Sequence, residues 1–307
     1  MGIYLNPGND LFAQALSSEI YVDKSMLIRL TNERLNSNDR HICISRPRRF
    51  GKSMAANMLV AYYSRNCDSK ELFSSLAIAD TLDFEDHLNK YNVIHLDMTR
   101  FASKAPDVKG MIDRLELTLK QELSELCADI SYPDFYSSDE ILTLIYNKYR
   151  IPFVFIIDEW DCVFRIHKND IEGQTAYLDY LKILLKDRPY VALDYATGIL
   201  PVKKYGQHSA LNMYCEYSII DAEPFAEYMG FTESEVQGLC RRFDMPFDEM
   251  KGWYNGYHVG DTSIYNPQSV VNACLRKRFS NYWTKTETFE ALKIYIQLDM
   301  DGLRNDI

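Results

Sequence analysis

The stretch RPRRFGKS, at residues 46–53, contains residue types that bind phosphate. The apolar run 42–44 before it predicts a buried strand, and a series of helix formers without Gly or Pro follows it. Gly51 permits a tight turn around an oxyanion, and the first amides of the helix direct the positive end of its dipole at that anion. Lys52 can supply charge to the outer phosphates of a nucleotide, and the Ser53 hydroxyl can coordinate Mg²⁺.

One position departs from the usual phosphate-loop pattern. Glycine is expected six residues before the lysine, and this chain has Arg46 there. Arg46, Arg48 and Arg49 either replace the flexibility of that glycine with charge or face a partner, and we favour the first interpretation. Gly-Lys-Ser alone also fits an ordinary helix start behind a basic loop, so a second motif has to decide. The predicted nucleotide-binding residues are Arg46, Pro47, Arg48, Arg49, Phe50, Gly51, Lys52, Ser53 and Met54.

The second motif is an acid pair, Asp158-Glu159, at the end of the apolar run 153–157. Such a run is typical of a central parallel strand that is covered on both faces. Two acids at the carboxyl end of a buried strand fit a Walker B site, where the aspartate holds Mg²⁺ and the glutamate orients the attacking water. An isolated Asp-Glu pair is more often a strand end that enters solvent. Together with the loop at 46–53 it predicts a Mg-nucleotide site, with Ser53 and Asp158 as metal ligands.

Polar residues also lie within and after the next predicted strand, 190–196. Thr197 follows the end of this strand, where many P-loop ATPases place a side chain that senses the terminal phosphate. Asp194 lies inside the strand, and the sequence offers no account of it. Three basic residues in neighbouring connections are expected to face solvent: Arg165, Lys203 and Lys204.

Composition restricts the classes of function. The chain has 307 residues, 47% hydrophobic and 25% charged, which is typical of a soluble globular protein. Its net charge of −10 argues against a surface devoted to nucleic acid, although a local basic loop is compatible with that charge. Seven dispersed cysteines indicate reduced thiols in a cytoplasmic protein, with Cys43 and Cys162 as core residues. The longest apolar run is too short to span a bilayer, so we expect no membrane segment.

The character of the chain changes near residue 221, after which strand-like runs are scarce. A Gly-Asp pair between two aromatic-rich runs predicts a hairpin near 253–266. The remainder of this part has helical patterns. We therefore predict two domains, a P-loop ATPase core with a helical entry segment over 1–220 and a mostly helical C-terminal lid over 221–307.

Six segments share a family pattern: YVDKS at 21–25, SRPRRFGKS at 45–53, IDE at 157–159, TGILP at 197–201, WYNGY at 253–257 and YNP at 265–267. Together they resemble the AAA-ATPase-like family, bacterial P-loop proteins that are often fused to a C-terminal restriction-endonuclease-like domain. The resemblance covers nearly the whole chain, and it explains the missing glycine because the family is similar to this sequence in having Arg-Pro-Arg-Arg-Phe there. It implies an α/β fold with a mainly parallel sheet of the additional-strand type, in which a further strand lies between the phosphate-loop and Walker B strands.

The nuclease part of such fusions is not expected here. A nuclease domain would need roughly another 150 residues and an acid-acid-lysine core, and the sequence ends at Ile307 without either. We therefore expect no nuclease activity, whether the chain is a truncated form or a stand-alone ATPase module. The expected cofactors are ATP or ADP with Mg²⁺.

These observations predict an ATP-hydrolysing module that acts as a nucleotide-driven conformational switch. The predicted catalytic residues are Lys52, which holds phosphates, Glu159, which polarises water, and Thr197, which reports the terminal phosphate. Two alternatives stay open: a nucleotide-binding regulatory scaffold with little turnover, and a small-molecule kinase, which the acid pair argues against. The expected partners are the nucleotide and a protein partner or second copy of the chain, whereas the net charge does not support a nucleic acid.

Overall fold

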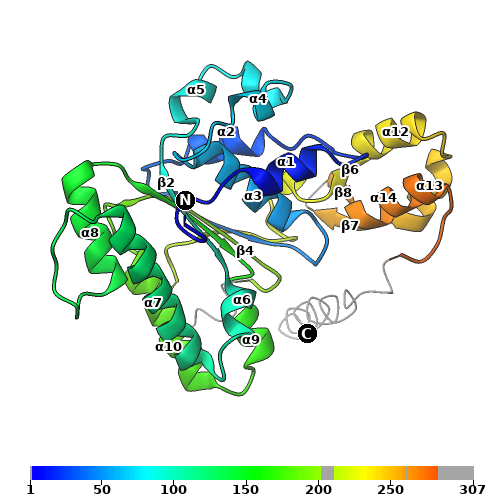
Figure 1. Cartoon of the computed structure of the whole chain (residues 1–307). Helices are drawn as coiled ribbons and strands as arrows, with labels where there is room; N and C mark the ends of the chain where they lie inside the picture. Colours follow the sequence, from blue (N-terminus) through cyan, green and yellow to red (C-terminus); the bar gives the residue numbers. More distant parts are fainter. Residues whose placement is uncertain (1, 202–210, 260–261, 283–307) are drawn as a thin grey trace. The chain divides into compact units, whose positions relative to one another are not determined.

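The computed structural model describes residues 2–201, 211–259 and 262–282 (Figure 1). The chain forms two compact units, and the first holds the described residues of Met1–Ile44 and Ser53–Glu216. The second holds those of Ser45–Lys52 and Tyr217–Ile307, so the predicted phosphate loop groups with the C-terminal part of the chain. The domain boundary at residue 220 stays a prediction, and Lys203 and Lys204 lie outside the described residues.

The first unit is built on a five-stranded, mainly parallel sheet with the strand order β2-β3-β4-β1-β5. The strands are β1 (His41–Ser45), β2 (Asn92–Asp97), β3 (Phe153–Asp158), β4 (Val191–Gly198) and β5 (Cys215–Tyr217). β2, β3 and β4 pair in parallel, and β4 lies between β3 and β1. This order confirms the predicted α/β fold, with an additional strand between the strand before the phosphate loop and the strand that carries the acid pair.

Helices cover both faces of this sheet, which explains why every residue of β3 and β4 is buried. On one face α7 (Val108–Leu126), α8 (Ser138–Tyr149) and α10 (Ile171–Leu185) lie side by side, with the short helices α6 (Met98–Ala102) and α9 (Cys162–Ile166) nearby (Figure 1). The other face carries α1 (Asp10–Leu16), α2 (Leu27–Asn32), α3 (Lys52–Tyr63), α4 (Lys70–Phe73), the 3₁₀ turn η1 (Ala77–Asp80) and α5 (Phe84–His87). Among the described residues, no helix combines the length and the apolar character that crossing a bilayer requires.

The helix that follows the phosphate loop, α3, is held firmly at its C-terminal end. Tyr62 and Tyr63 are fully buried there. The Tyr62 hydroxyl donates to the Phe84 carbonyl at 2.8 Å, and the Tyr63 hydroxyl donates to the Asn32 side chain at 2.8 Å. Because the helix is rigid over its twelve residues, these contacts also fix the position of Ser53 in its first turn.

Several buried side chains of the first unit have a structural role. Cys43 and Cys162 are fully buried, which confirms the prediction that they are core residues. Burial raises the pKa of the Cys162 thiol to about 12. Asp194 is also fully buried, and its carboxylate lies 3.1 Å from Nδ1 of His41 on the neighbouring strand β1. A polar partner of this kind offsets the cost of burying a carboxylate, which is the account of Asp194 that the sequence lacked.

The second unit combines a small antiparallel sheet with helices. Its strands are β6 (Phe231–Thr232), β7 (Asn255–Val259) and β8 (Thr262–Tyr265), in the order β6-β8-β7. Its helical elements are the 3₁₀ turn η2 (Ala226–Tyr228), α12 (Glu233–Arg242), α13 (Phe247–Tyr254) and α14 (Pro267–Arg276). The antiparallel pair β7–β8 is the hairpin predicted near 253–266.

Candidate functional site

Asp158, the last residue of β3, is the central residue of the candidate site in the first unit. Its Oδ2 accepts a hydrogen bond from the Ser53 hydroxyl at 2.5 Å, and its Oδ1 accepts one from the Thr197 hydroxyl. Asp158 is buried, with 6% of its surface exposed. The structure therefore brings together three residues that the sequence singled out in three separate motifs.

The strand register explains why Thr197 lies beside Asp158. β3 and β4 run parallel, with Ile157 opposite Ala196, so the next residue of each strand comes to the same edge of the sheet. Open α/β sheets place their ligands at this carboxyl edge. Ser53 reaches the edge from the first turn of α3, where helix amides are free to bind an anion.

Glu159 begins the turn from β3 to α9, with a left-handed backbone at φ +56°. Its carboxylate forms an ion pair with Arg165 on α9, and the two side chains are only 21% and 16% exposed. The expectation that Arg165 faces solvent was therefore wrong. Burial by itself lowers the pKa of the Arg165 guanidinium, but the charges of Asp161 and Glu159 more than offset this effect and leave the pKa raised.

Asp161 links this ion pair to the segment after β4. Its Oδ2 accepts hydrogen bonds from the amides of Ile199 at 3.1 Å and Leu200 at 2.9 Å, and from Nε of Arg165 at 3.2 Å. The sequence analysis missed Asp161 and the contacts of Arg165. The available signal was their spacing, because an acid and an arginine four residues apart meet on one side of a helical turn.

Within the second unit, Lys52 at the end of the predicted phosphate loop forms hydrogen bonds with the backbone at the start of the loop. Nζ of Lys52 donates to the carbonyls of Arg46 at 3.0 Å and Pro47 at 3.1 Å, and the residue is 4% exposed. Gly51 has φ +89°, a conformation that side chains disfavour. The lysine ammonium thus connects the two ends of the loop.

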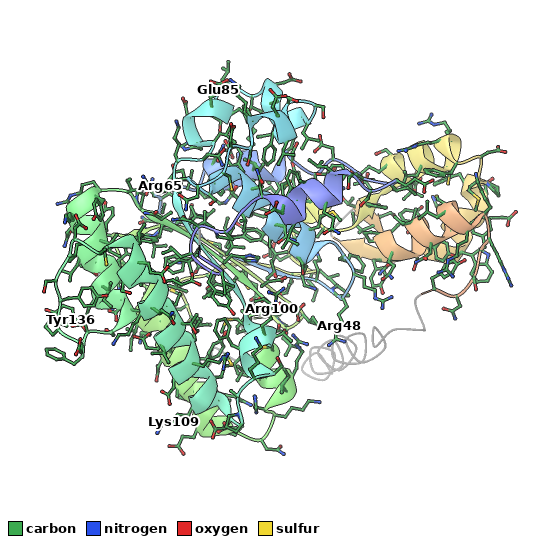
Figure 2. All side chains as sticks on the ribbon, viewed as in Figure 1. Arg48, Arg65, Glu85, Arg100, Lys109 and Tyr136 are labelled. Carbon is green, nitrogen blue, oxygen red and sulfur yellow. The ribbon has the colours of Figure 1, made fainter. Side chains whose placement is uncertain are left out.

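Arg46, which stands where glycine was expected, is fully buried. Its NH1 donates to the carbonyls of Ser45 and Tyr217, each at 2.9 Å. In this structure the guanidinium fixes the loop to Tyr217, whereas we expected it to supply charge to the loop. The other predicted binding residues differ in exposure: Pro47 is buried, Arg48 is half-buried, and Arg49 and Met54 are exposed (Arg48 is labelled in Figure 2). Their contact with a nucleotide stays a prediction.

Phe50 anchors the loop in the hydrophobic core of the second unit. The side chain is 1% exposed, and its ring meets the ring of Tyr257 edge to face, with centroids 4.9 Å apart. Its carbonyl accepts a hydrogen bond from the Gly230 amide at 3.0 Å. Three further buried residues complete the cluster: Ala222, Ala226 and Ile264. The residue immediately before Gly51-Lys52 is therefore a core residue of the C-terminal part of the chain.

Ser53 and Asp158 carry oxygen atoms of the kind that bind a magnesium ion, and their role as its ligands stays a prediction. Mg²⁺ prefers oxygen ligands, and the facing oxygens of these side chains lie 2.5 Å apart. Within the described part of the chain, no group of three or more His, Cys, Asp or Glu residues could hold a metal ion. A nucleotide-bound Mg²⁺ does not need such a group, because it is commonly held by one or two protein side chains, waters and phosphates.

A family model described as "Predicted AAA-ATPase" matches residues 12–207 of the sequence. This range contains the phosphate loop, the acid pair and Thr197. The chain belongs to the AAA-ATPase-like family. The matched range of this AAA-ATPase-like chain includes Phe50 but ends before Tyr217 and before its buried neighbours Ala222, Ala226 and Ile264.

Two further comparisons place the AAA-ATPase-like chain among known proteins. It is 25% identical over 256 residues to an Azotobacter chroococcum mcd 1 protein named "Uncharacterized protein in vnfD 5'region", a match that covers 81% of this chain and 48% of that protein. The chain thus spans about half the length of this curated relative. Among solved structures it is similar to the ORC2 protein of Aeropyrum pernix, described in ADPNP–ADP complexes, with a TM-score of 0.36 and 12% identity over 75% of this chain and 54% of that one.

Proposed function

We propose that the chain binds ATP together with Mg²⁺ and hydrolyses the ATP, and that this cycle acts as a conformational switch. The observation that carries the proposal is the meeting of the Ser53 and Thr197 hydroxyls on the Asp158 carboxylate. The three residues come from three motifs far apart in the sequence and meet at the edge where α/β sheets bind ligands. Membership of the AAA-ATPase-like family supports the same class of ligand.

The proposal gives each residue a role. The loop amides and Lys52 hold the phosphates, and Thr197 contacts the terminal one. Ser53 and Asp158 hold the magnesium ion, which when bound neutralises charge on the phosphates. Glu159 accepts a hydrogen bond from the attacking water and orients it.

The position of Lys52 supports a switch. Its ammonium donates to the carbonyls of Arg46 and Pro47, so a phosphate that binds Lys52 would compete with these two acceptors for its donors. Nucleotide binding would therefore change the hydrogen bonding of the loop itself, and the loop is attached through Phe50 to the core of the second unit.

One observation favours the alternative of a regulatory scaffold with little turnover. The Glu159 carboxylate already forms an ion pair with Arg165. A glutamate held in this way can orient the attacking water only if the ion pair leaves its carboxylate within reach of that water. Measurement of turnover decides between the two functions. The cytoplasmic location and a protein partner remain predictions.

Substitution Ser53→Ala tests the proposed metal site. It removes one oxygen ligand but leaves the loop amides and Lys52 in place, so Mg-dependent phosphate release should fall about ten-fold. Binding of a fluorescent ADP analogue in EDTA should be unchanged. As a control, Ser103→Ala removes an exposed hydroxyl that donates to the Arg100 carbonyl at 3.2 Å, and it should change neither quantity. The proposal fails if the wild-type chain binds no Mg-ATP in a calorimetric titration.

A further inference from the structure

Arg165 is held in place against the residue proposed to orient water. It forms an ion pair with Glu159 and also donates from Nε to Asp161 at 3.2 Å. Arginine and glutamate side chains normally retain many rotamers, and each rotamer that is excluded lowers their freedom to move. Two attachments and low exposure distinguish this arginine from one in an ordinary surface ion pair. Its side chain is only 16% exposed.

Asp161 gives Arg165 a rigid support. The carboxylate is fully buried and accepts the amides of Ile199 at 3.1 Å and Leu200 at 2.9 Å. These amides follow Gly198, the last residue of β4, and lie two and three residues after Thr197. Moving the Asp161 carboxylate would break these buried hydrogen bonds, which is costly in free energy.

The segments after β3 and β4 also approach each other closely. The Trp160 amide donates to the Thr197 carbonyl at 3.0 Å. At Gly198 an added Cβ would lie 2.6 Å from Nε1 of Trp160, so no larger residue fits there without a shift. The segment after β3, which leads to Arg165, and the segment after β4, which follows Thr197, are therefore closely packed against each other.

We propose that Arg165 is a positioning residue, which holds the Glu159 carboxylate in the orientation that water activation requires. Through Asp161, Arg165 also connects Glu159 to the segment after Thr197. The inference rests on the proposed ATP hydrolysis. Arg165 itself contacts neither water nor nucleotide in this mechanism. Its effect on the rate is exerted through Glu159, because a small displacement of a catalytic group is enough to slow a reaction strongly.

The test measures phosphate release by Arg165→Ala, Arg165→Lys and the double variant Arg165→Ala/Glu159→Gln. We expect kcat of Arg165→Ala to fall about ten-fold with KM unchanged. Lysine keeps the charge but can reach fewer acceptors, so Arg165→Lys should recover part of the loss. In the Glu159→Gln background the alanine substitution should have no further effect, because the two residues act as one unit.

Arg100→Ala is the matched control. Arg100 lies on α6 and pairs with Asp97 at the end of the adjacent strand β2, but its side chain is 63% exposed (Figure 2). This variant removes the same charge near the same sheet edge and should keep the wild-type kcat. Thermal unfolding of each variant shows whether the fold is retained.

The possible results separate the inference from the proposed function. An Arg165→Ala variant that is folded and as active as the wild type, or more active, overturns the positioning role. A loss that is equally large in the Glu159→Gln background overturns it as well, because the arginine then acts independently of Glu159. If the wild-type chain itself releases no phosphate, the proposed hydrolysis fails and the inference fails with it.

Discussion

Replacement of Glu159 by glutamine should lower ATP turnover by roughly 10²- to 10³-fold and leave ATP binding intact. Glutamine has the same size and tolerates the same backbone, but it lacks the negative charge that polarises water. The substitution also removes the ion pair with Arg165. Since the Glu159 side chain is partly exposed and Arg165 retains Asp161 as its partner, we expect little change in the free energy of unfolding.

Two measurements separate turnover from binding in this variant. Phosphate release with enzyme in excess of ATP reports the chemical step, and titration with a fluorescent ATP analogue reports affinity. Lys52→Ala is the reference for the opposite outcome, because loss of the ammonium should weaken nucleotide binding itself. Glu159→Gln that hydrolyses ATP at the wild-type rate would show that another group orients the water.

Phe50→Ala should destabilise the second unit by about 3–5 kcal/mol, the usual range for removing a buried phenylalanine. The ring is 1% exposed and fills the space among Ala222, Ala226 and Ile264, where small neighbours cannot close the cavity easily. Because Phe50 lies two residues before Lys52, the loop that should bind phosphate loses its anchor at the same time. We therefore also expect weaker nucleotide binding, although Phe50 carries no charge.

Urea unfolding and amide exchange measure the two effects of Phe50→Ala. The denaturation midpoint should fall, and the Gly230 amide, which donates to the Phe50 carbonyl at 3.0 Å, should exchange faster. Phe135→Ala removes the same ring from a position that is 82% exposed, so it should leave both readouts unchanged. Unaltered exchange at Gly230 in Phe50→Ala would mean that the backbone contact does not depend on the ring.

The predictions of the fold that succeeded rest on short sequence patterns that determine where a strand lies in the sheet. The continuous apolar run of β3 required two covered faces, and the acid pair at its end therefore had to lie at the ligand edge of the sheet. The position of Thr197 at the same edge followed in the same way, from its place at the end of the next strand, whereas its role as a sensor stays a prediction. For these residues strand direction alone decides which end of the sheet they occupy.

The features that sequence reasoning did not reveal depend on contacts between distant segments. Arg46 was interpreted as a source of charge, but its buried guanidinium donates to Tyr217, 171 residues further along the chain. Phe50 was counted only as part of a binding loop. Its basic neighbours in the loop do not indicate which distant residues its ring packs against. Arg165 stands six residues after Glu159, and its pairing depends on the left-handed turn at Glu159, which the residue type does not predict.

The attachment of the phosphate loop to the core around Phe50 has a thermodynamic consequence. In the proposed function, a nucleotide that binds residues 46–52 is coupled energetically to the cluster at Ala222, Ala226 and Ile264, because Phe50 belongs to both. By reciprocity, any protein whose binding loosened that cluster would weaken the proposed nucleotide binding by the same factor as the nucleotide weakens the binding of that protein. Residues beyond position 207, outside the range that the family model matches, would then regulate the proposed ATP hydrolysis.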